Sequence, residues 1–355
     1  MKTLILLIAL AIPQLIFSQD RMQYSIQQGN PPVVKGPASV SIAPSKVASQ
    51  EWKFFDGNTI QCTINSAGPY CDYLRTNSSG LFWPKGSNKT AVYTAGIWIT
   101  GIHRPTGLLR TAVQDYVTEF QPGPVLSTFN TTTNSADAAA NPNDPKYHIY
   151  KINKGDEDLP PTGRNLDYDY WPGDLGAPFI DVNGNGRWDG GIDKPKLYGD
   201  QELWCVYNDA NQTNHLSVGT TAPMGIEAQA TYFGFANVFP NIMFVRWKII
   251  NKSDADYDSV FVSLWSDTDL GDGNDDMAAC DTTLNLVYVY NGDNNDGTPA
   301  GYGNKPPSDG FVLLQGPKVP GQPTDSAISE GLYTHGYKNL RAYSSSQYFN
   351  TQFGA

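Results

Sequence analysis

The sequence is poor in charge, histidine, cysteine and catalytic signatures. Only 17% of its 355 residues are charged, and only four are histidine. The histidines form neither HExxH nor HxH, so no zinc-hydrolase motif is present. The usual serine-esterase signature, GxSxG, does not occur either. No CxxC pair occurs, so zinc-ribbon and thiol-redox sites have no support.

Long apolar runs are also missing, except at the N-terminus. Lys2 is followed by a mainly apolar run from Leu4 to Phe17, and the small residue Ser18 precedes Gln19. A basic residue, a short apolar core and a small residue are typical of a secretory signal peptide. The run is shorter than the about 20 residues that span a bilayer. We expect residues 1–18 to be removed, and the mature chain to be extracellular or on the cell surface without a transmembrane segment.

What the sequence has in quantity is turn-forming and aromatic residues: 34 glycines, 25 prolines, 20 tyrosines and 8 tryptophans. With few charges, this composition favours strands joined by loops. Residues 19–50 are rich in Gln, Pro, Ser and Val and predict an extended leader. Residues 51–355 predict a β-rich globular region, with a sub-boundary near the polar stretch 123–145. The expected fold is mainly β, an antiparallel sandwich or jelly roll with long loops and little helix.

Apolar residues that alternate with polar ones predict the strands. The strand-like runs are 91–103, 108–120, 146–152, 202–207, 225–235, 242–250, 259–266, 284–290 and 310–315. The runs 242–250 and 259–266 are separated by a short polar stretch, which predicts a β-hairpin. Only residues 135–140 look briefly helical.

The net charge of −11 repels nucleic acid phosphates and anionic lipid, so no nucleic acid partner is expected. It suits divalent cations, or neutral ligands such as extracellular glycans and other cell-surface components. Solubility outside the cell explains the same charge equally well. The oligomeric state is not specified by the sequence.

Four cysteines in an exported chain permit two disulfides. Cys62 and Cys71 are separated by a stretch that can turn, so a short loop closure is expected between them. Cys205 with Cys280 then follows by elimination.

The sharpest motif is a loop with oxygen-bearing side chains at positions 1, 3, 5 and 9 and a glycine, Gly186, at position 6. This spacing matches a calcium loop, because alternate residues point inward and the glycine permits a sharp bend. Position 12 of the EF-hand pattern is Ile192, so Asp193 would have to supply the closing acid. The candidate ligands for Ca²⁺ are Asp181, Asn183, Asn185, Arg187 through its carbonyl, Asp189 and Asp193. An Asx-rich turn that needs no metal is the alternative.

A second, weaker acidic cluster follows later in the chain. Its members are Asp267, Asp269, Asp272, Asp275 and Asp276. Carboxylates this close repel one another unless a cation lies between them, but an exposed, solvated loop is equally consistent. The stretch 291–297 is read first as a turn.

Catalytic acids are not singled out by any motif. A glycosidase needs two carboxylates across a cleft, and Glu119, Glu202 and Glu227 lie in strand-like runs. The tryptophans offer a sugar-stacking surface, although in β-sandwiches they more commonly form the core.

Several segments between 179 and 315 form a recognisable set. They are the acidic loop, 200–209, 225–229, 249–253, 265–267, 270–272, 280–284 and 290–293, with 83–86 and 95–98 upstream. Together they resemble large secreted proteins of Bacteroidota-like bacteria that are commonly exported by the type IX secretion system. The DxNxNG pattern of the loop also resembles dockerin-like and thrombospondin-like modules. The resemblance implies surface display or release and transfers no catalytic residue.

Such proteins usually continue into β-sandwich repeats and a C-terminal sorting domain. No such domain follows here, so we expect a fragment or another route out of the cell. The combined hypothesis is a secreted or cell-surface, non-enzymatic adhesion, matrix or structural module stabilised by calcium. The alternative is a secreted carbohydrate-active protein, either a glycan-binding module or a glycoside hydrolase.

Overall fold

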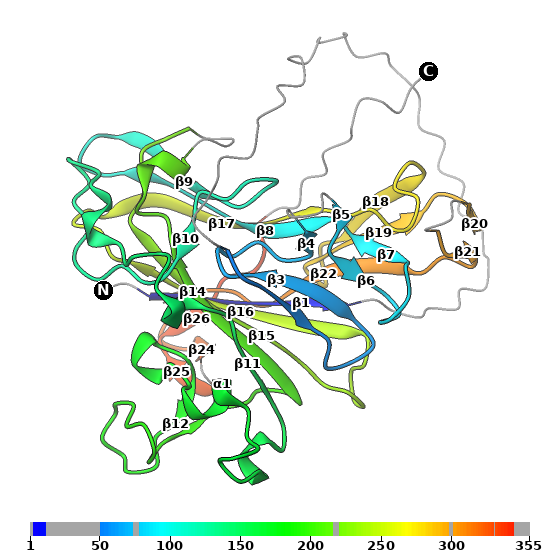
Figure 1. Cartoon of the computed structure of the whole chain (residues 1–355). Coiled ribbons are helices and arrows are strands. Elements are labelled where there is room, and N and C mark those ends of the chain that lie inside the picture. The colour runs from blue at the N-terminus through cyan, green and yellow to red at the C-terminus, as the bar shows by residue number, and fades with distance from the viewer. Residues whose placement is uncertain are drawn as a thin grey trace.

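A computed structural model describes residues 3–11, 50–73, 78–215, 220–297, 301–329 and 331–343, with backbone alone for 3–11, 72 and 73. Strands make up 45% of the structure and helices 7% (Figure 1). The predicted fold class, mainly β and antiparallel with long loops, is confirmed. In the described residues, the only α-helix is α1 (Leu166–Asp169).

A large antiparallel sheet forms one layer of the molecule. Its strands follow the order β10-β14-β15-β16-β1-β22-β19-β18, and β11 also pairs with β14. The bounds are β10 (Gln121–Pro122), β14 (Gln201–Asn208), β15 (Ile226–Gly234), β16 (Ile242–Asn251), β1 (Thr3–Ala11), β22 (Ser308–Gln315), β19 (Leu286–Asn291), β18 (Asp276–Asp281) and β11 (Tyr150–Asn153). Because β10 and β11 both pair with β14, the chain on either side of the polar stretch 123–145 belongs to one sheet.

Two smaller sheets pack against the large one. The first has the order β17 (Tyr257–Asp267), β8 (Thr94–His103), β9 (Leu108–Val113), and the second the order β2 (Trp52–Phe55), β3 (Gln61–Asn65), β6 (Leu81–Phe82), β7 (Thr90–Val92). The Tyr70 ring, beside β8, lies 5.8 Å from the Tyr232 ring of β15 and 6.1 Å from the Trp247 ring of β16. These contacts join the layers through one apolar core.

Short hairpins and single turns complete the fold. The hairpins are β4 (Asp72–Tyr73) with β5 (Ser78–Ser79), β12 (Phe179–Ile180) with β13 (Lys194–Pro195), β20 (Asn295–Asp296) with β21 (Gly303–Asn304), β23 (Lys318–Pro320) with β26 (Tyr337–Asn339), and β24 (Ser326–Ser329) with β25 (Leu332–His335). The 3-10 turns are η1 (Ala136–Ala138), η2 (Pro145–Tyr147), η3 (Asp156–Asp158), η4 (Gly173–Leu175) and η5 (Gln212–Asn214). The predicted helical stretch 135–140 corresponds to η1, which the Ser135 hydroxyl caps by accepting from the Asp137 N–H.

Each predicted strand-like run contains a strand, but the predicted hairpin 242–266 is wrong. Strand β16 pairs with β15 and β1, whereas β17 pairs with β8 in the other layer. The connecting turn is held by Asn251, which accepts from the Ser253 N–H and donates to the Ala255 carbonyl. Alternation shows which side of a strand is buried; it does not identify the neighbouring strand. The turn therefore carries the chain from one layer to the other.

The N-terminal apolar run differs most from expectation. Thr3–Ala11, predicted to be part of a cleaved signal, forms β1, a central strand between β16 and β22 (Figure 1). Export and cleavage stay predictions, and the predicted leader lies outside the described residues except for Gln50. The described part of the chain contains no helix with the length and apolarity to cross a bilayer.

The predicted Cys205–Cys280 disulfide is wrong. Cys205 is buried in β14 and Cys280 is exposed on β18. Five strands separate them in the sheet, which amounts to roughly 25–30 Å at the usual strand spacing. A disulfide requires Cα atoms within about 7 Å. Cys62 and Cys71 do come together, with their Sγ atoms 3.2 Å apart.

Candidate functional site

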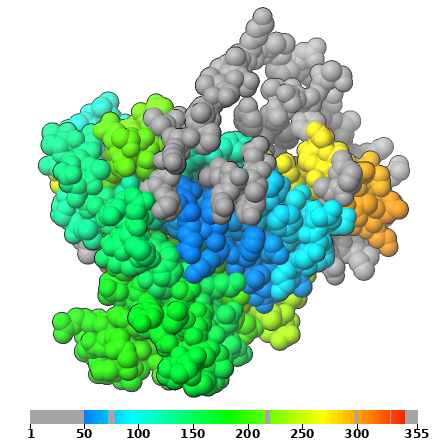
Figure 2. Space-filling view, in the orientation of Figure 1, coloured from blue at the N-terminus to red at the C-terminus, as the bar shows by residue number. Residues whose placement is uncertain are grey.

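The acidic loop at 181–193 connects β12 to β13, whose pairing closes its base. Figure 1 places β12 at the lower edge of the molecule, and the green part of the chain forms a lower lobe in Figure 2. Gly184 and Gly186 have φ angles of 73° and 77°, a left-handed conformation that glycine adopts without strain. Trp188 anchors the loop by packing edge-on against Phe179, with ring centroids 5.6 Å apart. The loop is thus fixed at both ends and exposed between them.

The Asp181 carboxylate organises the first half of the loop. Its oxygens accept the backbone N–H groups of Gly184 at 2.7 Å, Asn185 at 3.2 Å and Gly186 at 2.7 Å. Three donors around one carboxylate turn the chain back on itself. This is the tight turn that the positions of the glycines predicted.

Asp189 and Asp193 accept the hydrogen bonds that close the rest of the loop. Asn183 Nδ2 donates to Asp189 Oδ2 at 2.8 Å, and Asn185 Nδ2 donates to the same oxygen. These bonds, the Asn183 bond first, lower the pKa of Asp189 from its ordinary value. The buried Asp193 carboxylate accepts from the N–H groups of Val182 at 2.9 Å and Asp189 at 2.7 Å. The five predicted side chains therefore meet in one compact loop.

Arg187 takes part through its backbone. Its N–H donates to Asn185 Oδ1 at 2.8 Å, while its own carbonyl makes no hydrogen bond among those found in the described residues. The predicted role of that carbonyl as a ligand stays a prediction.

The donor chemistry of the loop fits calcium better than a transition metal, because every candidate ligand is an oxygen. Within the described residues, no three His, Cys, Asp or Glu side chains form a group that could hold a metal ion. A calcium ion here would need amide and backbone oxygens beside the carboxylates, and calcium accepts both. Asn183 and Asn185 now turn their N–H₂ groups toward Asp189, so rotation of each amide would be needed to present its oxygen.

The second predicted cluster is spread over several partners. Asp267 accepts from the Tyr116 hydroxyl at 2.8 Å, and Asp272 accepts from Asn274 Nδ2 at 2.6 Å. Burial, followed by the neighbouring charges of Asp267 and Asp272, raises the pKa of Asp269 to about 6. These three carboxylates lie along the end of β17 and the loop after it, and the structure does not gather them with Asp275 and Asp276 around a shared centre.

Asp275 and Asp276 are half-buried and instead belong to a polar group, with the buried Asp296 and Asp309, that sequence reasoning missed. Asp275 Oδ2 accepts from Asn291 Nδ2 at 3.1 Å, and Asp276 Oδ2 accepts from the Leu270 N–H at 2.8 Å. Burial raises the pKa of Asp276 to about 7, and the charges of Asp269, Asp275 and Asp296 act in the same direction. Asp309 on β22 is 1% exposed, and burial raises its pKa to about 8.

The turn interpretation of 291–297 therefore needs refinement. Asp296 is 1% exposed and accepts from the N–H groups of Asp272 at 2.9 Å and Tyr302 at 2.7 Å. It joins the β20–β21 hairpin to the loop that contains Asp272. Nothing in its local sequence separates it from an exposed turn residue, because its partners lie 24 residues before it and 6 after it.

The three candidate catalytic glutamates are all buried. Glu119 accepts from the Val113 N–H at 2.9 Å and lies 3.4 Å from His215 Nδ1. Glu227 accepts from the Val125 N–H at 3.0 Å. Burial raises the pKa of Glu202 to about 8. All three carboxyl groups are therefore held away from solvent.

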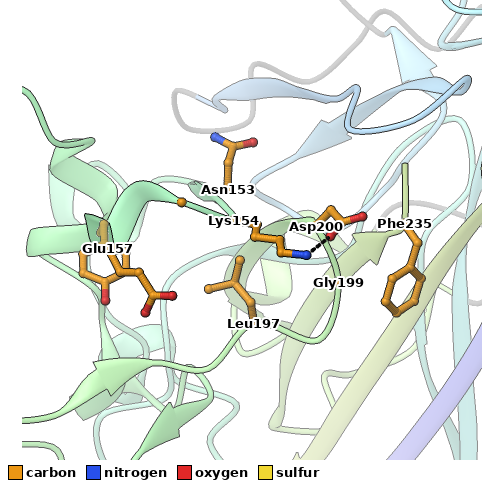
Figure 3. Close-up of a pocket in the computed structure, with 9 residues that line it drawn as sticks. Asn153, Lys154, Glu157, Leu197, Gly199, Asp200 and Phe235 are labelled. Carbon is orange, nitrogen blue, oxygen red and sulfur yellow. Dashed lines mark hydrogen bonds and ion pairs between the residues drawn. The ribbon is translucent and has the colours of Figure 1, made fainter. Parts of the chain in front are cut away.

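Two shallow pockets lie on the surface, and neither is lined by these glutamates. The first, of about 290 Å³, lies where β11 ends and β14 begins; in Figure 3 the Lys154 ammonium reaches the Asp200 carboxylate, 3.2 Å away. The Ala236 N–H is the main cause of a lowered pKa at Asp200, which holds this carboxyl in its charged form. The second, of about 630 Å³, lies between 125–128 and 251–256.

The tryptophans divide between core and surface. Trp83, Trp171, Trp204 and Trp247 are buried. Trp98 and Trp265 are half-buried on neighbouring strands, β8 and β17, with nearly parallel rings 6.1 Å apart. Tyr116, 53% exposed, meets Trp265 edge-on at 5.2 Å. This aromatic group lies outside both pockets.

Comparison of the chain with protein-family models, curated proteins and solved structures finds no match in any of the three.

Proposed function

We propose that the protein is a secreted or cell-surface, non-enzymatic β module with an adhesive, matrix or structural role, and that calcium stabilises its 181–193 loop. One observation carries the calcium proposal: Asp181, Asn183, Asn185, Asp189 and Asp193 converge in a glycine-kinked loop. Export is proposed from the N-terminal signal pattern. The resemblance to secreted Bacteroidota-like proteins supports the same compartment.

The ion would act on the loop and not on a substrate. Asp181 and Asp189 now accept from backbone and amide N–H donors, and a cation between the two carboxylates would add charge attraction to both. Extracellular calcium modules bind with dissociation constants of about 10⁻⁴ to 10⁻³ M. At 10 mM calcium, a dissociation constant near 1 mM stabilises the fold by about 1.4 kcal/mol.

Thermal unfolding of the purified protein in 10 mM calcium chloride and in EGTA tests the proposal. Calcium should raise the melting temperature by about 2–5 °C. Asp181→Ala should abolish that difference, whereas Asp158→Ala, at an exposed carboxylate in the η3 turn, should retain it. Equal melting temperatures in calcium and in EGTA would refute the calcium site.

A glycan-binding role is the second candidate, and the Trp98, Trp265 and Tyr116 group favours it. Aromatic rings on a sheet face are the usual surface for stacking sugars. A glycan array and a polysaccharide hydrolysis screen separate the outcomes. Binding that Tyr116→Ala weakens, without turnover, identifies a binding module. Turnover that Glu202→Gln or Glu227→Gln abolishes identifies an enzyme.

A further inference from the structure

The space that β1 fills between β16 and β22 is termed the β1 slot. Strand β1 runs antiparallel to both neighbours, from Thr3 opposite Ile250 to Ala11 opposite Ile242. No pairing joins β16 directly to β22 among the described strands. Without an occupant these two strands would lie about 10 Å apart, which is two strand spacings.

The same nine residues form half of the predicted export signal, residues 1–18. If the signal is removed, β16 loses its partner along nine register positions, and β22 loses it along five. Backbone N–H and C=O groups left unpaired in a buried sheet each cost roughly 1–3 kcal/mol. The core residues Trp247 and Phe311 would also lose the neighbouring strand in the sheet. A processed protein therefore needs another strand in the slot.

The side chains beside the slot specify the pattern of that strand. On β16, buried Val245 and Trp247 alternate with half-buried Arg246 and Lys248. Residues directly opposite each other on antiparallel strands lie on the same face. Over this part of the slot, the occupant should carry apolar residues beside Val245 and Trp247 and polar ones beside Arg246 and Lys248.

The export signal meets only half of this requirement. Leu6 and Ile8 stand opposite Trp247 and Val245, which suits the core face. The next positions over, Ile5 and Leu7, stand opposite Lys248 and Arg246. Apolar residues at successive positions suit a signal peptide, but Ile5 and Leu7 do not match the two cations opposite them.

A segment with the required alternation follows the predicted cleavage site directly. Within 21–27, Met22, Tyr24 and Ile26 alternate with Gln23, Ser25 and Gln27. Such a pattern is typical of a half-buried antiparallel strand. The remaining leader is interrupted by Pro31, Pro32, Pro37 and Pro44, and proline is excluded from central strands.

We propose that removal of the signal is followed by strand replacement, in which Arg21–Gln27 enters the β1 slot. Met22, Tyr24 and Ile26 then face the core beside Val245 and Trp247. Gln23 and Ser25 lie beside Arg246 and Lys248. The 22 residues from 28 to 49 reach up to about 70 Å when extended, whereas a domain of this size has a radius of gyration of about 19 Å. The connection back to Gln50 is long enough.

Hydrogen exchange on the protein purified from the culture medium tests this inference, which depends on the export part of the proposed function. N-terminal sequencing tests export separately: a start near Gln19 or Asp20 confirms cleavage, and retention of residues 3–11 overturns both cleavage and replacement. In the processed protein, amides of 21–27 should exchange about 100-fold or more slower than those of an unfolded chain, with β16 and β22 equally protected.

Paired variants control for loss of stability. Tyr24→Asp should lower the melting temperature and remove protection from β16, whereas Ser25→Asp, beside Arg246 and Lys248, should leave both unchanged. Ile42→Asp, in the shorter alternating stretch 39–43, should also have no effect. Fast exchange at 21–27 in a protein whose β16 stays protected, or a response to Ile42→Asp and not to Tyr24→Asp, overturns the assignment of the occupant.

Discussion

The Sγ atoms of Cys62 and Cys71 lie 3.2 Å apart in the buried core, where β3 and the turn after it meet. Outside the cytoplasm, thiols this close are expected to oxidise to a disulfide. Closing a loop of this length stabilises a fold by about 2–3 kcal/mol. Peptide mapping without reductant should recover the Cys62–Cys71 pair, and added reductant should lower the melting temperature.

Cys280→Ser is the matched control, because Cys280 is exposed on β18, far from Cys205 in the same sheet. This variant should melt like the parent protein. Recovery of a Cys205–Cys280 peptide would contradict the strand order.

In the acidic loop, Asp193 and Asn183 are expected to have separable roles. Asp193 accepts two backbone N–H groups while buried, so Asp193→Ala should destabilise the protein by about 1–3 kcal/mol with or without calcium. Asn183 is exposed, so Asn183→Ala should weaken only the response to calcium. Urea unfolding in calcium and in EGTA checks this, and equal effects of the two variants would argue against the division.

The protein should be more stable in mild acid than at alkaline pH. Burial raises the pKa of Glu202 and Asp309 to about 8 and that of Asp276 to about 7, so the folded state binds protons that the unfolded state has released. Their contribution is complete below about pH 4 and falls as pH rises through 7 to 8, by at most about 1.4 kcal/mol per group and pH unit.

Asp309→Asn tests this pH dependence. The variant should flatten the decline in melting temperature between pH 6 and pH 9, whereas Asp293→Asn, on an exposed loop, should leave the profile unchanged. A decline of equal steepness in Asp309→Asn would show that other groups cause it.

A buried hydrogen bond joins two strands of the large sheet, from Trp247 Nε1 to the Tyr207 hydroxyl at 2.9 Å. Tyr207→Phe leaves the indole N–H without this acceptor and should cost about 1–3 kcal/mol in denaturant unfolding. Tyr170→Phe, at a ring 72% exposed, is the control and should cost nothing measurable. If Tyr207→Phe and the parent protein were equally stable, this hydrogen bond would contribute nothing measurable to the fold.

Local patterns in the sequence predicted the strands and the acidic loop, because both depend on residues a few positions apart. The Asp181 turn closes within five residues, and the alternation in β16 needs only its own ten. Residues that only the tertiary structure brings together leave no local pattern in the sequence. Glu119 approaches His215, and the buried Asp309 approaches Asp276, only after distant strands have paired.

The N-terminal apolar run shows that composition alone can fit two different structures. An apolar stretch of nine residues satisfies the rules for an export signal and also fills a central strand position. Composition cannot decide between the two uses. The β-sheet register adds what composition lacks, namely the residues that stand opposite each position of β1.

Strand β17 meets β8 across a long interval of chain: the Arg104 side chain at the end of β8 binds the Asp258 carboxylate 154 residues later. Closing a loop of that length costs chain entropy before the strand pairing can stabilise it. Folding should therefore be slow compared with domains built from local contacts. Until residue 267 has emerged from the ribosome, the edge of β8 that pairs with β17 has no complete partner strand. The second layer of the fold is therefore completed only after most of the chain has been made.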